Sequence, residues 1–86
     1  MKHFTLFYLP GCPFCKRAFA YIEELKAEHP EYQKIELETI NENEHPDIAD
    51  QYDYYYVPTF YIEGKKAHEG GIFKNEVEEL LKQVIE

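Results

Sequence analysis

The sequence contains no tryptophan, one methionine and only two cysteines, and it is short of positive charge. Nine lysines and arginines face seventeen acidic residues, which leaves a formal net charge of −8. A surface this acidic argues against nucleic acids and anionic membranes as partners, because both select basic proteins. No apolar run approaches the roughly 18–20 residues that a membrane span requires. The composition therefore indicates a small, acidic, soluble protein.

The amino-terminal segment has one lysine and a short apolar run that is interrupted at Pro10 and Gly11. It lacks the longer apolar core and the small-residue cleavage site of a secretory signal peptide. We therefore expect a cytoplasmic protein. A chain of 86 residues predicts one domain, residues 1–86, and we expect it to act as a monomer.

The two cysteines lie together in the stretch YLPGCPFCKRAF, where Pro13 and Phe14 separate Cys12 from Cys15. A single close pair is not a disulfide framework, and structural disulfides are rare in the cytoplasm. A bond between these cysteines would therefore be one that forms and breaks. The pair predicts a redox-active dithiol.

The hydrophobic pattern predicts an α/β domain with the element order β-α-β-α-β-β-α. The first β-α-β unit gives a parallel strand pair, and a hairpin around Gly64 adds antiparallel strands, so we expect a four-stranded mixed sheet flanked by helices on both faces. A capping box of Asn75 and Glu78 is predicted to start the last helix. The other predicted elements are strands at 3–9, 34–40, 59–62 and 67–69 and helices at 13–28 and 41–53.

This order places Cys12 at the junction of the first strand and the first helix, with Pro13 as the first helical residue. Unpaired backbone N–H groups and the helix dipole favour a thiolate at that position, and Lys16 and Arg17 add positive charge. Cys15 follows one turn later and is more shielded. We expect Cys12 to attack a substrate disulfide and Cys15 to resolve the mixed disulfide that forms.

Other uses of a cysteine pair stay open at this point. A zinc site within one chain needs four ligands, and the chain has no second Cys-x-x-Cys pair and only scattered histidines. An iron–sulfur cluster or metal held between two chains by the same thiolates is the alternative function. Two inert buried cysteines are the purely structural alternative.

Three motifs at matching separations carry a family resemblance: PGCPFC around the cysteines, VPTF at 57–60, and Gly70-Gly71 before the last helix. From Phe4 to Ile85 the chain resembles the thioredoxin superfamily, and its glutaredoxin branch most. The resemblance implies a thioredoxin/glutaredoxin-like fold and a thiol–disulfide oxidoreductase acting on protein or low-molecular-weight disulfides. It implies no tightly bound cofactor or metal, and glutathione or a thioredoxin reductase as the electron donor.

The resemblance also implies a substrate site around the cysteines. Pro58 is expected to follow a cis peptide bond and to lie against the cysteine pair, where the Val57 backbone can pair with an extended substrate. The tyrosine-rich segment 52–56 precedes it, either packed as a loop or forming an aromatic lip for substrate. Substrate contacts are expected from Tyr8, Pro13, Phe14, Val57, Pro58, Gly70 and Gly71.

The sequence departs from these relatives at several positions. Leu6 stands where thioredoxins carry a buried aspartate, and no tryptophan precedes Cys12. Leu9 replaces a lysine that holds glutathione in many glutaredoxins, and Ile72, Phe73 and Lys74 follow the glycine pair in place of an aspartate. The charged contacts for glutathione are therefore largely missing, which predicts that glutathione serves this protein poorly.

Overall fold

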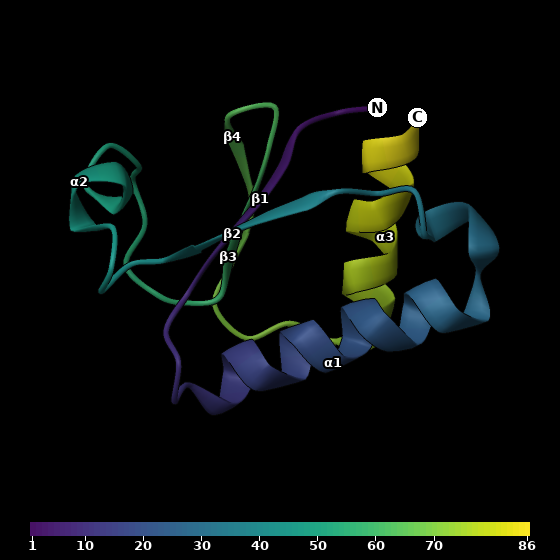
Figure 1. The fold of residues 1–86 in the computed structure, drawn as a ribbon, viewed down its shortest axis with the longest axis horizontal. Helices are drawn as coiled ribbons and strands as arrows, with labels where there is room; N and C mark the ends of the chain where they lie inside the picture. Colours follow the sequence, from purple (N-terminus) through teal and green to yellow (C-terminus); the bar gives the residue numbers. More distant parts are fainter.

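Strand β1 (Phe4–Tyr8) pairs with a neighbour on each side in a sheet with the order β2-β1-β3-β4 (Figure 1). The computed structural model describes every residue from 1 to 86. Strand β2 (Leu37–Asn41) runs parallel to β1, whereas β3 (Thr59–Ile62) and β4 (Lys65–Glu69) continue the sheet with antiparallel pairs. The mixed four-stranded sheet and the element order are confirmed.

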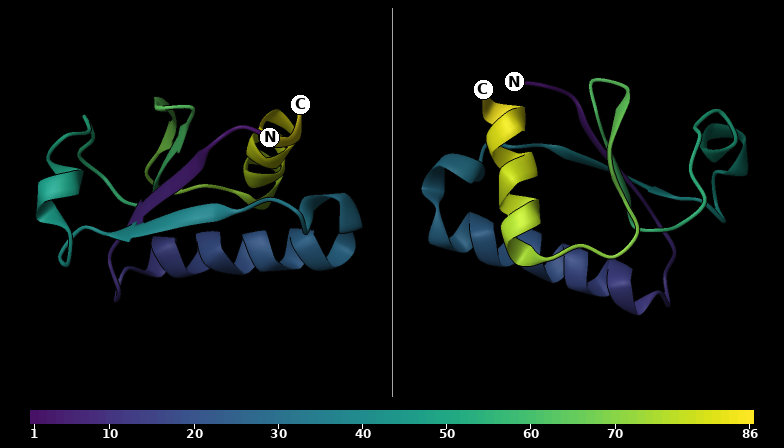
Figure 2. Two further views of the ribbon diagram at one scale, coloured as in Figure 1. Left: turned by 45° about the horizontal axis from the view of Figure 1, so that its top comes forward. Right: turned by 180° about the vertical axis from the view of Figure 1, so that it is seen from behind.

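Both faces of the sheet are covered, because successive side chains of β1 point to opposite sides. Phe4 and Leu6 belong to the larger buried cluster, which lies beneath α1 (Pro13–Glu28) and α3 (Lys74–Ile85). Phe7 belongs to a smaller cluster on the other face, next to α2 (Pro46–Ala49). In Figures 1 and 2 the short α2 stands apart from the two long helices. The prediction of helices on both faces is confirmed.

Helix α1 has the predicted bounds. Pro13 occupies the first helical turn, where its missing N–H removes no hydrogen bond. Ala18, Ile22 and Leu25 recur at helical spacing and are buried against the sheet. The helix ends before His29-Pro30, and a short 3-10 helix, η1 (Pro30–Tyr32), turns the chain back toward the sheet.

Several predicted elements have different bounds, and β1 covers Phe4–Tyr8 rather than the predicted 3–9. The second strand begins at Leu37 rather than residue 34, because β1 begins at Phe4 and the register pairs Phe4 with Leu37. The helix predicted at 41–53 shrinks to Pro46–Ala49. The Asn41 side chain accepts the Asn43 N–H at 3.0 Å, which forms a local turn where the prediction had a helix start.

The last helix begins at Lys74, before the predicted capping box. Glu76 accepts the Phe73 N–H at 3.0 Å, so the acidic residue of the first turn is Glu76. Glu78 instead accepts the Tyr32 hydroxyl at 2.9 Å. Val77, Leu80 and Leu81 are buried against the sheet and α1.

The hairpin is confirmed, with a tight turn at Glu63 (φ 53°) and Gly64 (φ 77°), and β4 starts at Lys65, two residues before the predicted 67. The first three residues of β4, Lys65, Lys66 and Ala67, are exposed.

The long helices are tied together by one lysine. Lys74 of α3 pairs with Glu24 at 3.1 Å and with Glu28 at 3.0 Å on α1. The chain termini lie side by side, and the Lys2 N–H donates to the Val84 carbonyl at 3.0 Å (Figure 2). No helix has both the length and the apolar character needed to cross a membrane.

Candidate active site

Cys12 caps the amino end of α1, immediately after the loop that leaves β1. Its Sγ accepts the backbone N–H of Cys15 at 3.2 Å, and the Lys16 N–H donates to the Cys12 carbonyl at 3.0 Å. The side chain is partly exposed. A sulfur that faces helix N–H donors and remains open to solvent is placed to carry negative charge and to meet a substrate.

Cys15 lies one turn further along α1 and faces the interior, with 1% of its surface exposed. Burial, followed by the hydrogen bond with Cys12, raises the pKa of the Cys15 thiol to about 12. Both cysteines are free thiols in this structure. The two sulfurs therefore differ in access, with Cys12 at the surface and Cys15 behind it.

The loop before β3 meets the cysteines from the other side. The Val57–Pro58 peptide bond is cis, as the resemblance implied, and the Val57 carbonyl lies 3.8 Å from the Cys12 Sγ. Pro58 is buried, and its carbonyl accepts the Gly70 N–H at 2.8 Å. The Val57 N–H has no hydrogen-bond partner in the structure. An unpaired backbone group beside the reactive sulfur can pair with an incoming extended chain.

The tyrosine-rich segment divides into a packed part and an exposed part. Tyr52 and Tyr54 pack their rings against Phe7 at centroid distances of 4.8 and 5.0 Å. Tyr55 and Tyr56, in contrast, are 86% and 70% exposed. Loop packing therefore describes the first two, and the aromatic lip remains a prediction for the last two.

Glu69, at the end of β4, anchors the exposed tyrosines. Its carboxylate accepts the backbone N–H groups of Tyr55 and Tyr56 and pairs with Lys66 at 2.8 Å. The bond from Lys66, and then the bonds from the two N–H groups, lower the pKa of the Glu69 carboxyl to about 2. The Glu69 carboxylate therefore stays charged, and able to accept these two N–H groups, at pH values above about 2. Nothing in the sequence pattern had singled out Glu69.

The predicted substrate residues gather at this end of the molecule. Phe14 is 53% exposed and lies against Gly71, where an added Cβ would meet its ring at 3.2 Å. Gly70 has a φ of 88°, which favours glycine, and faces the Cβ of Tyr56. Tyr8 is half-buried, and its ring packs edge-on against Phe19 of α1 at 5.1 Å. Pro13 is exposed beside Cys12.

A groove of about 400 Å³ extends from this site between α1 and the loop before α3. The spacing of Phe14, Ala18, Ile22 and Leu25 predicts one buried stripe on α1, but Phe14 is 53% exposed and lines this groove. The signal that was available is a second stripe on that helix, Phe14, Arg17 and Tyr21, at spacings of three and four residues. The groove is lined by Phe14, Arg17, Tyr21, Gly71, Ile72 and Phe73.

Lys74 belongs to the contact between the two long helices. It is engaged by Glu24 and Glu28, further along α1, and these bonds raise the pKa of its ammonium group. Lys74 is therefore committed to joining two helices.

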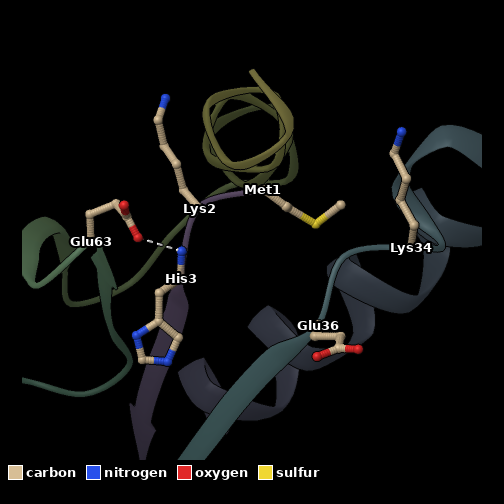
Figure 3. Close-up of a pocket in the computed structure, with 6 residues that line it drawn as sticks. All are labelled: Met1, Lys2, His3, Lys34, Glu36 and Glu63. Atoms are coloured by element: carbon tan, nitrogen blue, oxygen red, sulfur yellow. Dashed lines mark hydrogen bonds between the residues drawn. The ribbon is translucent and has the colours of Figure 1, made fainter.

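A larger hollow of about 480 Å³ lies at the opposite end of β1, near both termini. Figure 3 shows Glu63 on one side of it and Lys34 and Glu36 on the other, with Met1 between them. It contains neither cysteine and none of the predicted substrate residues. No three His, Cys, Asp or Glu side chains come close enough to hold a metal ion. The chemistry therefore centres on the cysteine pair.

Known proteins resemble this chain in sequence and in fold. A family model described as "Thioredoxin domain" matches residues 2–82. A protein named thioredoxin from Methanocaldococcus jannaschii is 36% identical over 78 residues, which cover 91% of this chain and 89% of that protein.

Solved structures with similar folds include two thioredoxins. Oxidised thioredoxin from Plasmodium falciparum matches with a TM-score of 0.71 at 20% identity, over 95% of this chain and 79% of that one. Mitochondrial thioredoxin 3 from Saccharomyces cerevisiae gives 0.71 at 24% identity, over 95% and 77%. All of these matches are to thioredoxins, so the assignment to the glutaredoxin branch stays a prediction.

Proposed function

The chain belongs to the thioredoxin family of dithiol–disulfide oxidoreductases, and we propose that Cys12 is its attacking thiol and Cys15 its resolving thiol. The observation that carries this division is the contrast in access: Cys12 is partly exposed at the helix N-terminus, whereas Cys15 is 1% exposed. The N–H of Cys15, at 3.2 Å, supports charge on the Cys12 sulfur.

The reaction transfers two electrons from the protein to the substrate disulfide. The Cys12 thiolate attacks one sulfur, the substrate S–S bond breaks, and the other sulfur leaves as a thiolate. Cys15 then loses its proton and attacks the Cys12 sulfur, which forms the Cys12–Cys15 disulfide and releases the second substrate thiol. A donor dithiol or two glutathione molecules return the pair to the reduced state.

Protein disulfides, presented in an extended segment, are the substrate class that the surroundings of Cys12 favour. The unpaired Val57 N–H lies beside the attacking sulfur, and a substrate strand can donate to and accept from that backbone. The exposed rings of Tyr55 and Tyr56 add apolar contact area next to it. A lone dithiol of this kind suits a reducing compartment, and we place the protein in the cytoplasm.

Alkylation of the two single variants tests the assignment of roles. At neutral pH the Cys15→Ser variant, which retains Cys12, should react with iodoacetamide at least about a hundredfold faster than the Cys12→Ser variant. Only the thiolate reacts, and the raised pKa of Cys15 keeps its thiolate scarce. Because burial is the larger cause of that shift, the rate for Cys15 should still climb at about pH 10.

The control for this comparison is the same measurement in urea, where both variants should react at similar rates. Faster reaction of the variant that retains Cys15, in the folded state at pH 7, would reverse the two roles.

Glutathione is expected to reduce the oxidised protein slowly, and Leu9→Lys should raise that rate. Leu9 precedes the cysteine loop and offers no charge to a glycyl carboxylate. A charge-assisted hydrogen bond contributes about 1.5–3 kcal/mol, which corresponds to roughly ten- to a hundredfold in affinity. The measurement is the rate at which glutathione reduces the oxidised protein. Lys74 stays unchanged, because Lys74→Asp would place a third carboxylate beside Glu24 and Glu28.

Leu9→Gln is the matched control, since it is polar and carries no charge. Rapid reduction of the unmodified protein by glutathione, with no gain in Leu9→Lys, would contradict this prediction.

A further inference from the structure

The groove beside the cysteines has an apolar lining that solvent reaches. Phe14 and Phe73, from its two walls, are 53% and 72% exposed, and they are two of the five large hydrophobic side chains exposed on the molecule. Its volume of about 400 Å³ lies in the lower part of the range, about 300–1,000 Å³, that ligand clefts cover. Exposed aromatic surface next to a reactive sulfur indicates a contact area for a partner.

One cation projects into this groove without a carboxylate partner. The Arg17 guanidinium lies 5.3 Å from the centre of the Phe14 ring, and it takes part in none of the ion pairs of the structure. All seventeen acidic residues follow Ile22 in the sequence, so the first turns of α1 carry no negative charge. Arg17 is thus an uncompensated cation in a protein of net charge −8.

Beyond the residues that line the groove, both α1 and α3 carry acidic side chains. Lys74 is already paired with Glu24 and Glu28, and Glu76 accepts the Phe73 N–H at 3.0 Å. A bound carboxylate would therefore be attracted to Arg17 and repelled beyond it. This gradient sets where along the groove an acidic side chain can bind.

The axial separation of Cys12 and Arg17 along α1 indicates the register of an extended ligand. Five residues of helix advance about 7.5 Å along its axis. An extended chain advances about 3.3 Å per residue, so two residues cover a similar distance, and residues two apart point to the same face. An extended substrate with its cysteine at Cys12 therefore has the side chain two positions away closest to Arg17 in axial position, and the Arg17 guanidinium lies over the ring of Phe14.

Resting on the proposed function, we propose that this groove selects protein substrates by the segment next to their reacting cysteine. The preferred segment is extended and carries a carboxylate two residues from that cysteine, with an apolar side chain beside it. Arg17 binds the carboxylate, and Phe14, Tyr21 and Phe73 contact the apolar side chain. Arg17 is a specificity residue and takes no part in the exchange of electrons.

Short blocked peptides with one cysteine test this selection. Each cysteine carries thionitrobenzoate in a mixed disulfide, so attack by Cys12 on the peptide sulfur releases a coloured thiolate. Glu, Gln or Lys is placed two residues before or after the cysteine, with leucine next to it. In a matched series the same residues are placed directly beside the cysteine, where an extended chain points them away from Arg17.

The unmodified protein should release the thiolate from the glutamate peptide about three- to tenfold faster than from the lysine peptide at low salt, in at least one direction. Arg17→Glu should reverse that order. Lys16→Glu is the matched control, with the same charge change on the neighbouring residue, and it should keep the order. The preference should shrink in about 0.5 M salt, and it should be weaker in the adjacent-residue series.

Three results would overturn the proposal: equal rates for all peptides, a preference that Arg17→Glu leaves unchanged, or equal effects of Arg17→Glu and Lys16→Glu. Each of these leaves the dithiol chemistry intact. Release from no peptide at all, or release by Cys12→Ser at the unmodified rate, would instead refute the proposed function, and the substrate site with it.

Discussion

Cys12→Ser should lower the rate of disulfide reduction by about a thousandfold or more, because it removes the sulfur that we propose attacks the substrate and leaves no substitute. Cys15, with 1% of its surface exposed and a pKa raised to about 12, cannot replace it. Cys15→Ser should behave differently. It retains the first attack and loses the second, so each protein molecule releases one leaving thiol and then stops as a mixed disulfide.

A burst measurement with a chromogenic disulfide, followed by mass spectrometry of the intact protein, separates the two outcomes. Circular dichroism of both variants serves as the control for folding. A stoichiometric burst from Cys12→Ser, together with none from Cys15→Ser, would contradict the assignment.

Phe60→Ala should produce a large loss of stability. Phe60 of β3 has no exposed surface, and its ring stacks on Phe4 at 5.5 Å in the cluster beneath the two long helices. Truncating a buried phenylalanine costs about 3–5 kcal/mol, because it removes apolar contacts and leaves a cavity. In a domain of this size, that change lowers the midpoint of thermal unfolding by more than about 10 °C.

Phe73→Ala is the matched control, since the same substitution is made at a side chain that is 72% exposed. It should change the free energy of unfolding by no more than about 0.5 kcal/mol. Urea titration of both variants measures the two values. Comparable losses in the free energy of unfolding would contradict this prediction, because they would show that the buried and the exposed ring stabilise the fold equally.

Elements with strong patterns were predictable from the sequence, and elements that depend on side-chain turns were not. Helix α1 combines an initial proline with a long apolar stripe, and its bounds came out as predicted. The segment after β2 contains helix-start residues, yet the Asn41 side chain bonds the Asn43 N–H and forms a turn instead. Whether an asparagine caps a helix or closes a turn depends on the backbone around it, which a periodic pattern does not specify.

Some residues of the site were likewise predictable from the sequence, and others were not. Cys12, Cys15 and Pro58 belong to short motifs whose neighbours in the chain locate them, and the structure brings them together. Glu69 and Arg17 draw their roles from segments far away in the sequence: Glu69 from the Tyr55 and Tyr56 amides, and Arg17 from the groove shared with Phe73. No local pattern marks the role of Glu69, and for Arg17 the stripe with Phe14 and Tyr21 marks only one wall of the groove, because the other wall comes from a distant segment.

The two residues between the cysteines are exposed, and neither belongs to a buried cluster. Pro13 and Phe14 therefore contribute little to the free energy of folding, although they are the two residues that separate the cysteines in the chain. Substitutions there can alter the chemistry of the pair and its choice of partner while the scaffold keeps its stability. Natural drift or laboratory selection can thus explore this dipeptide freely, in a domain whose small core tolerates few changes elsewhere.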